Sequence, residues 1–178
     1  MLFRSRGPEE DVLERFLIAA DQVKAQHIVR ICGDNPLIDR QLIRSLIHTH
    51  LRENTDYTIT SDSIPLGTGT EVVKVKALKS IAGTTTEPKY REHVTTWFHD
   101  NPTLVSQSHV PAPAYLMNKS HRLTVDTRND LTLMEKIFDE FYSLASPLLD
   151  LEKVIQFLDT RPDISQINAD TPQKNWRS

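Results

Sequence analysis

Two aspartates stand where apolar, β-branched runs end and helices are expected to begin. Asp34 follows the expected strand 27–32, and Asp126 closes the expected strand 121–126. In open α/β sheets, ligands bind outside the carboxyl ends of the strands. Carboxylates there can hold Mg²⁺, which takes a few oxygen ligands from protein and the rest from water and substrate phosphate. If the strands are neighbours, the pair predicts a metal site that bridges nucleotide phosphates.

Each aspartate taken alone also has a simpler structural role. Asp34 is followed by Asn35-Pro36, a sequence typical of an Asx turn, and on this stretch alone that role is favoured. Asp126 alone is better explained as an acid at a helix start, because capping acids are common and catalytic ones are rare. The metal hypothesis therefore depends on the pair.

A second group with chemical potential is Arg91-Glu92-His93. Consecutive residues of a helix cannot all face one ligand. Arg91 could bind a carboxylate or phosphate, and His93 could donate a hydrogen bond to a hydroxyl. From the residues alone, a solvated helix face with a surface ion pair is favoured. The seven histidines have no zinc-site spacing, and the chain has no glycine-rich phosphate-loop motif.

These residues must be positioned by alternating helices and strands, which indicates an α/β fold. The 178 residues are enough for one domain, expected over 1–160 with a polar tail over 161–178. Helices are predicted over 8–24, 39–51 and 88–100, and two more are predicted to start at 127 and at 150. The expected caps are Asp39 for the helix 39–51, Thr127 with Asp130 for the helix that starts at 127, and Asp150 for the last helix. Strands are predicted over 27–32, 56–60, 70–75, 104–110 and 121–126.

Composition excludes several classes of function. A net charge of −3 without a basic run argues against nucleic-acid binding. The chain has no stretch of about 20 apolar residues, so no membrane span is expected. The single cysteine, Cys32, suits a reducing compartment. A cytoplasmic protein is expected.

Four blocks of sequence, in order, resemble the spore coat polysaccharide biosynthesis protein F family, which is similar to CMP-Kdo synthetases and acylneuraminate cytidylyltransferases. The blocks are Arg6-Gly7-x-x-x-Asp11-Val12-Leu13-x-Arg15, Val29-Arg30-Ile31-x-Gly33-Asp34-x-Pro36-Leu37-Ile38-Asp39, Arg91-Glu92-His93-Val94-Thr95 and Leu123-Thr124-Val125-Asp126-Thr127-x-x-Asp130-Leu131. The resemblance implies a three-layer α/β/α nucleotide-diphospho-sugar transferase fold, Rossmann-like, in which CTP and a sugar give a CMP-sugar and pyrophosphate.

The resemblance also implies roles for individual residues. Asp34 and Asp126 match the family's Mg²⁺ ligands and catalytic acids, which reverses the simpler readings above. Arg91, His93 and Glu71 are expected to line the sugar side of the same cleft. The segment Pro65-x-Gly67-x-x-x-Glu71 resembles the sugar-side loop, but Leu66 stands where an acid is usual. The sugar is expected to be acidic or modified.

One block of the family is not found in this sequence. Relatives begin with a strand and loop of the type Gln-Ala-Arg-x-x-Ser-x-Arg-Leu-Pro-x-Lys that holds the triphosphate, and nothing similar occurs here. The chain is therefore expected to resemble the C-terminal portion of a cytidylyltransferase that lacks the first strands. The alternative is a non-catalytic module that binds a sugar nucleotide or a partner subunit. A homodimer or a separately encoded N-terminal half are the expected partners, and residues 1–178 alone are expected not to make a CMP-sugar.

Overall fold

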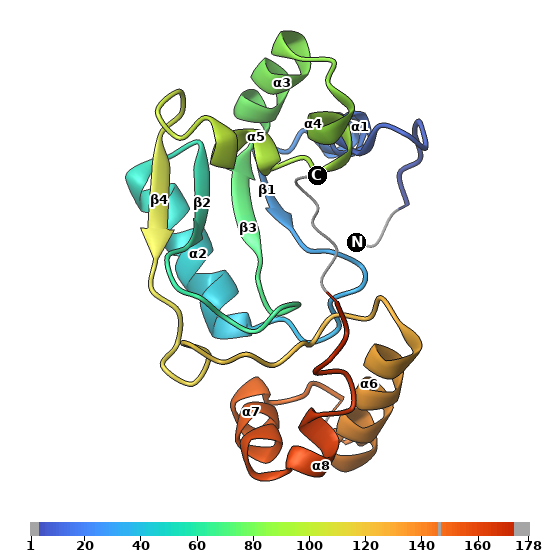
Figure 1. The fold of residues 1–178 in the computed structure, drawn as a ribbon. Helices are drawn as coiled ribbons and strands as arrows, with labels where there is room; N and C mark the ends of the chain where they lie inside the picture. Colours follow the sequence, from blue (N-terminus) through green and yellow to red (C-terminus); the bar gives the residue numbers. More distant parts are fainter. Residues whose placement is uncertain (1–3, 146, 173–178) are drawn as a thin grey trace.

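A mixed four-stranded sheet forms the centre of the molecule (Figure 1). The computed structural model describes residues 4–145 and 147–172. Along the sheet the order is β1-β3-β2-β4, and the strands are β1 (His27–Arg30), β3 (Glu71–Lys74), β2 (Tyr57–Thr60) and β4 (Gln107–Val110). β3 runs antiparallel to both of its neighbours, and β2 runs parallel to β4. β1, β2 and β4 therefore run in the same direction, and their carboxyl ends lie at the same end of the sheet.

Helices cover both faces of this sheet. Because side chains alternate along a strand, Val72 and Val73 of β3 face opposite layers. Val72 packs with Leu42 and Leu46 of α2 (Arg40–Glu53). Val73 packs in the opposite layer, which contains α1 (Val12–Val23), α3 (Val75–Thr84), α4 (Pro88–Glu92) and α5 (Thr96–Asp100). The chain thus has the three-layer α/β/α architecture that the resemblance implied.

A helical lobe lies below the sheet in Figure 1. It contains α6 (Arg128–Phe141), α7 (Leu151–Thr160) and α8 (Pro162–Ser165). Its apolar core is separate from those on the two faces of the sheet and is formed by residues of all three helices and of the segments that lead to them, among them Leu116, Leu123, Leu133, Ile137, Val154, Ile155, Leu158 and Ile164. None of the described helices is long and apolar enough to cross a membrane.

The predicted helix caps are confirmed. Asp39 accepts a hydrogen bond of 2.6 Å from the backbone N–H of Leu42 at the start of α2. Thr127 and Asp130 form a reciprocal capping box at the start of α6, and Asp150 caps α7. These side chains satisfy backbone donors that a helix start leaves without partners.

The predicted strand over 121–126 is wrong. The segment is extended but forms only one isolated bridge, between Arg122 and Leu66. Its backbone donors go to loops instead: Leu123 N–H lies 2.7 Å from the Leu66 oxygen, and Val125 N–H lies 2.9 Å from the Asp34 oxygen. Loop partners satisfy the backbone as well as a ladder would, so β-branched composition did not require a strand.

Three other elements differ from the prediction. The helix expected over 88–100 is divided into α4 and α5 at 93–95, and α3 was not expected at all. No side chain caps α3, which follows β3 directly, so its start carries no sequence signal. Part of the expected polar tail is folded, because it contains α8 and buries Ile164 and Asn168. The rest, 173–178, lies outside the described residues.

The sheet and the lobe approach each other closely at Gly67. This glycine has a φ of +92°, which residues with a side chain rarely adopt. A Cβ atom at this position would lie 2.4 Å from the carbonyl carbon of Leu123. Glycine is therefore required where the 61–69 loop passes the segment that leads into the lobe.

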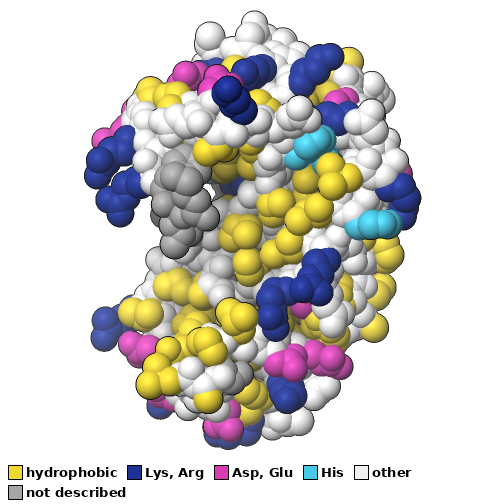
Figure 2. Space-filling model, turned by 180° about the vertical axis from the view of Figure 1, so that it is seen from behind, with side chains coloured by type: hydrophobic (Ala, Val, Ile, Leu, Met, Phe, Trp, Pro, Cys, Tyr) yellow, Lys and Arg dark blue, Asp and Glu magenta, His cyan; other side chains and the backbone are white. Residues whose placement is uncertain are grey.

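β1 lies at one edge of the sheet. Val29 of β1 and Ile31 just after it are 36% and 42% exposed. Figure 2, which views the molecule from behind, shows apolar side chains that form a band across the middle of that face. An edge strand with apolar side chains favours association with other chains, and the expected self-association remains a prediction.

Candidate functional site

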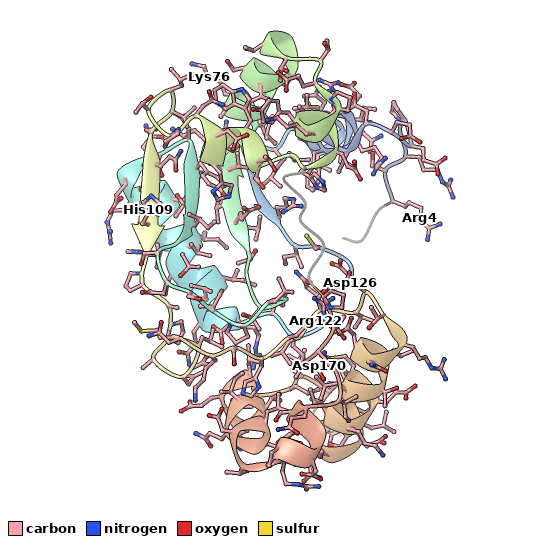
Figure 3. The ribbon with its side chains drawn as sticks, in the orientation of Figure 1. Arg4, Lys76, His109, Arg122, Asp126 and Asp170 are labelled. Atoms are coloured by element: carbon pink, nitrogen blue, oxygen red, sulfur yellow. The ribbon has the colours of Figure 1, made fainter. Side chains whose placement is uncertain are left out.

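A cleft of about 590 Å³ opens between the end of the sheet and the helical lobe. Four of the predicted site residues line it: Asp34, Glu71, His93 and Asp126. Arg122 and Asp126, from the segment before α6, lie between the sheet and the lobe (Figure 3). The cavity therefore collects residues of β1, β3 and α5 and of the turns next to them, together with the segment that leads into the lobe. It lies at the end of the sheet where the parallel strands end.

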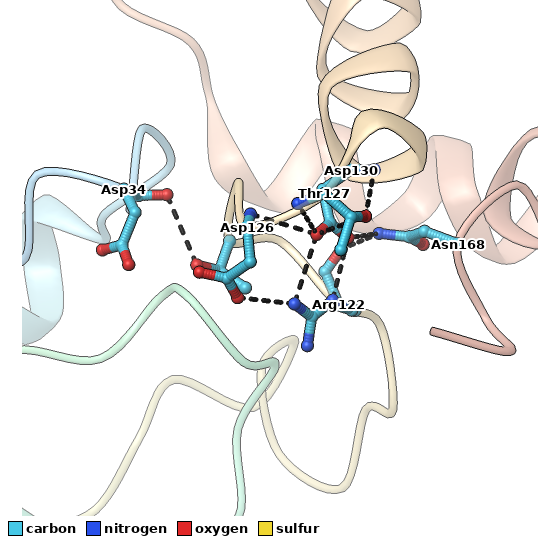
Figure 4. A network of polar contacts seen from close by, with 7 residues as sticks. Asp34, Arg122, Asp126, Thr127, Asp130 and Asn168 are labelled. Atoms are coloured by element: carbon cyan, nitrogen blue, oxygen red, sulfur yellow. Dashed lines mark hydrogen bonds and ion pairs between the residues drawn. The ribbon is translucent and has the colours of Figure 1, made fainter. Parts of the chain in front are cut away.

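Asp34 and Asp126 lie on adjacent loops of this cleft. The Asp34 carbonyl accepts a hydrogen bond from Val125 N–H at 2.9 Å, which ties the loop after β1 to the residue before Asp126. Figure 4 shows Asp126 between Asp34 and Arg122. Both aspartates are exposed, so their carboxylates are open to a ligand in the cleft.

The donor set of this pair suits Mg²⁺ rather than a transition metal. Among the described residues, no group of three or more histidines, cysteines, aspartates or glutamates is placed to hold a metal ion. Mg²⁺ is often bound through one or two carboxylates, with water and substrate phosphate as its other ligands. Two exposed carboxylates fit that requirement, and the sequence-predicted metal role of Asp34 and Asp126 stays a prediction.

The lobe side of the cleft is organised by Asp130, whose side chain is fully buried. Its carboxylate accepts hydrogen bonds from Arg122 Nε at 2.8 Å and from Asn168 Nδ2 at 2.7 Å. The backbone N–H groups of Asp126 and Thr127 donate to it at 3.1 and 2.9 Å. Burial alone would raise the pKa of Asp130, but these donors hold the pKa well below its usual range. Asp130 thus fixes both Arg122 and the backbone of Asp126.

Arg122 connects this buried carboxylate to the exposed one. Its Nη2 lies 3.2 Å from Asp130 and 2.5 Å from Asp126 (Figure 4). The Asp130 side chain is 0% exposed, whereas that of Asp126 is 44% exposed. The contact with Asp126 is therefore the more solvent-screened of the two, and Arg122 keeps its anchor if Asp126 takes another partner.

The sheet side of the cleft is organised by Glu71, the first residue of β3. Its carboxylate accepts hydrogen bonds from Arg30 Nη1 and Thr95 Oγ1, both at 2.9 Å. The Tyr57 hydroxyl also donates to it, and His99 Nε2 lies 3.7 Å away. Because the Tyr57 proton goes to Glu71, His99 Nε2 is the donor in its 3.1 Å contact with the Tyr57 oxygen. Glu71 lines the cleft, but its oxygens are used within the protein.

Glu71 remains ionised over a wide pH range. Burial on its own would raise the pKa of this carboxyl, but the hydrogen bonds and positive charge of its neighbours outweigh burial and lower the pKa to about 2. The Arg30 guanidinium is in turn held charged beside it, and its pKa is raised by Glu71 against the opposing effect of burial. The two side chains form a partly buried ion pair at the wall of the cleft.

The expected position of Arg91 in the cleft is corrected. Its guanidinium Nε donates to the Asp11 carboxylate at 2.8 Å, and Asp11 is the N-cap of α1. The ion pair holds α4 against α1, and Arg91 does not line the cleft. A sequence match cannot distinguish a ligand-binding arginine from one that pairs with an acid 80 positions away.

Sequence reasoning missed the residues that support the site. Arg30, Tyr57, Thr95, His99 and Arg122 received no role, although all of them contact the carboxylates just described. Arg30 and Arg122 stand close in sequence to Asp34 and Asp126, and this proximity was the signal available. Tyr57, Thr95 and His99 come from separate elements, and nothing in the sequence joins them.

Comparison with known proteins gives the family. Residues 2–165 match the model of the Cytidylyltransferase family. The chain belongs to this family. It is 37% identical over 172 residues to the uncharacterised protein MJ1063 of Methanocaldococcus jannaschii, with 97% of this chain and 69% of that protein covered. The cytidylyltransferase family therefore includes this chain by sequence as well as by architecture.

A second relative and a solved structure are also similar to this chain. The chain is 33% identical to the spore coat polysaccharide biosynthesis protein SpsF of Bacillus subtilis, over 89% of this chain and 65% of that protein. A cytidylyltransferase structure from Leptospira borgpetersenii serovar Hardjo-bovis superposes with a TM-score of 0.82. It covers 96% of this chain and 70% of the other at 22% identity, and it supports the fold alone. The general chemistry of the family is CTP-dependent nucleotidyl transfer.

Proposed function

We propose that the cleft transfers a cytidylyl group from CTP to the hydroxyl of a sugar, giving a CMP-sugar and pyrophosphate. The observation that carries the proposal is that Asp34 and Asp126, far apart in the sequence, line one cleft at the end of the parallel strands. A relative named for spore coat polysaccharide biosynthesis supports a product used for surface polysaccharide. The chain spans about two thirds of the length of that relative, so the activity of the whole protein is proposed for this chain.

The residues of the cleft have distinct roles in this proposal. Asp34 and Asp126 would hold Mg²⁺, which would offset the charge that develops on the leaving pyrophosphate. Asp130 keeps Asp126 in position by accepting a hydrogen bond from its backbone N–H. His93 lines the same cavity, where it can contact a sugar hydroxyl. Nucleotidyl transfer depends mainly on positioning and charge stabilisation, which this set of residues can supply.

The first test measures Mg²⁺-dependent CTP binding by calorimetry. Asp34→Asn and Asp126→Asn are each expected to weaken it about tenfold or more, because each removes a charged metal ligand. Both side chains are exposed, so the free energy of unfolding should change by about 0.5 kcal/mol or less. Asp139→Asn, an exposed substitution on α6 outside the cleft, is the matched control and should leave CTP binding unchanged.

Turnover is then followed as pyrophosphate release from CTP with a panel of acidic and neutral sugars. A wild-type chain that does not bind CTP would overturn the proposal. Binding that neither aspartate variant weakens would remove the metal assignment. CTP binding without pyrophosphate release from any sugar would favour the non-catalytic module that binds a sugar nucleotide.

A further inference from the structure

Arg30 is the charged residue of the cleft whose position the proposed chemistry does not explain. It is the last residue of β1 and reaches the cleft at the end of the sheet. Its side chain is 23% exposed, and its ion pair within the described residues is with Glu71. Arginine is favoured in partly buried ion pairs because its guanidinium presents several donors in a fixed plane.

The donors of Arg30 exceed the acceptors that the described protein offers it. A guanidinium has five N–H donors in a rigid plane. One of them, on Nη1, goes to Glu71 at 2.9 Å, and among the described residues the side chain donates no other hydrogen bond. The remaining donors belong to a group that lines the cleft. They match the geometry of a carboxylate or a phosphate, which arginine binds through two parallel hydrogen bonds.

Glu71 holds this guanidinium in advance of any ligand. The carboxylate is fixed by Tyr57 and Thr95 as well as by Arg30, and its side chain is only 12% exposed. It cannot turn toward a ligand without giving up those buried contacts. Most of the entropy lost when an arginine becomes ordered has therefore already been lost in the free protein, which favours binding.

The neighbours of Arg30 also favour an anion. Thr96 and His93 line the same cleft and carry hydrogen-bond donors, whereas the Thr95 hydroxyl and His99 Nε2 are already used by Glu71 and Tyr57. The nearby carboxylate of Glu71 is occupied within the protein, so it does not compete for the open side of the guanidinium. The other acids of the cleft, Asp34 and Asp126, form no ion pair with Arg30.

We propose that Arg30 binds an oxyanion of the ligand in the cleft, either a phosphate of the nucleotide or a carboxylate of the sugar, and that Glu71 positions it for that purpose. The inference deepens the proposed function, because it concerns the same cleft. It also changes the expected role of Glu71, which acts through Arg30 rather than on the sugar itself.

The test uses simple anions that require no turnover. Calorimetry measures binding of pyrophosphate, of glucuronate and of glucose, which lacks the carboxylate of glucuronate. Arg30→Lys retains the positive charge but loses the geometry that allows two parallel hydrogen bonds. It is expected to lower the affinity for the anion that Arg30 binds by roughly tenfold. Arg44→Lys, an exposed arginine of α2 outside the cleft, is the control and should change nothing.

Stability is controlled by a second variant. Arg30→Met alone would leave Glu71 buried without its cation and could unfold the chain. The double variant Arg30→Met/Glu71→Gln removes both charges together and is checked for folding by circular dichroism. The double variant is expected to lose affinity for the same anion as Arg30→Lys, and the loss of affinity should be larger.

Each result decides the inference. Loss of pyrophosphate binding assigns Arg30 to a phosphate, and loss of glucuronate binding alone assigns it to a carboxylate. Unchanged binding of both anions in the Arg30 variants overturns the inference, as does a wild-type chain that binds neither. A wild-type chain that binds pyrophosphate through Arg30 but does not bind CTP would support the inference and overturn the proposed function.

Discussion

The two walls of the cleft use the same device in different surroundings. On the sheet side, partly buried Glu71 holds Arg30; on the lobe side, fully buried Asp130 holds Arg122. Glu71 draws its partners from β1, β2 and the region of α5, whereas Asp130 is held mostly by residues within eight positions of itself. The sheet wall therefore depends on the whole fold, and the lobe wall depends largely on one local segment.

A second difference concerns what each arginine touches beyond its anchor. Arg122 also contacts Asp126, one of the proposed metal ligands. Arg30 contacts no such carboxylate within the described residues. The lobe wall is therefore suited to a cation and the sheet wall to an anion, although each contains an arginine held by an acid.

The largest expected effect is on the lobe wall. Asp130→Ala removes the anchor of Arg122 and the capping box of α6, and it should lower the free energy of unfolding by about 3–5 kcal/mol, as expected when one partner of a buried ion pair is lost. Urea denaturation followed by circular dichroism measures this loss. Asp139→Ala, on the exposed side of the same helix, is the control. A loss below about 1 kcal/mol would show that Asp130 is not the anchor.

The sheet wall should reveal itself through pH. The pKa of Glu71 is lowered from 4.5 to about 2 in the folded protein, so the unfolded chain binds more protons between these values. The resulting stability, up to about 3 kcal/mol, is fully present above pH 4.5 and is lost as the pH falls toward 2. Glu71→Gln should flatten the pH dependence of unfolding in this window. If the pH dependence of unfolding is the same in Glu71→Gln as in the wild-type chain, Glu71 is not the ionised group that provides this stability.

The smallest expected effect separates the two arginines by their partners. Lysine at position 122 cannot hold Asp130 and Asp126 together as the guanidinium does, so Asp126 should be more available to a cation. Arg122→Lys is expected to tighten Mg²⁺ binding about threefold, because a competing positive charge is less well placed. Arg30→Lys should leave Mg²⁺ binding unchanged in the same titration. Equal effects of the two substitutions would remove the distinction between the walls.

The parts of the fold that rest on local chemistry could be predicted from the sequence. The caps at Asp39, Thr127 and Asp150 place helix starts within a residue or two, because a short polar side chain before an apolar run satisfies the first backbone donors. Four of the five predicted strands were also found, each shorter than its predicted range, and the strand over 121–126 was not. α3 was missed because its start after Lys74 has no capping side chain.

The candidate site could be predicted only in part. The acids at the ends of two predicted strands indicated Asp34 and Asp126, and the run Arg91-Glu92-His93 indicated His93. The resemblance added Glu71, and all four of these residues line the cleft. Sequence could not show that Arg91 pairs with Asp11, or that Tyr57, Thr95 and His99 meet at Glu71, because these contacts join elements that only the tertiary fold brings together. The acids that pair with the arginines therefore could not be predicted from the sequence.

The close approach at Gly67 has a consequence for how this cleft can diversify. The spacing between the 61–69 loop and the segment before the lobe is set by main-chain atoms, since even one methyl group at position 67 would collide with Leu123. Replacement of Leu66 or His93, which line the cavity, alters the chemistry of its surface while leaving that spacing in place. The ligand preference of the cleft can thus change through side chains such as these, whereas the main-chain contact between the loop and the segment before the lobe requires glycine at position 67.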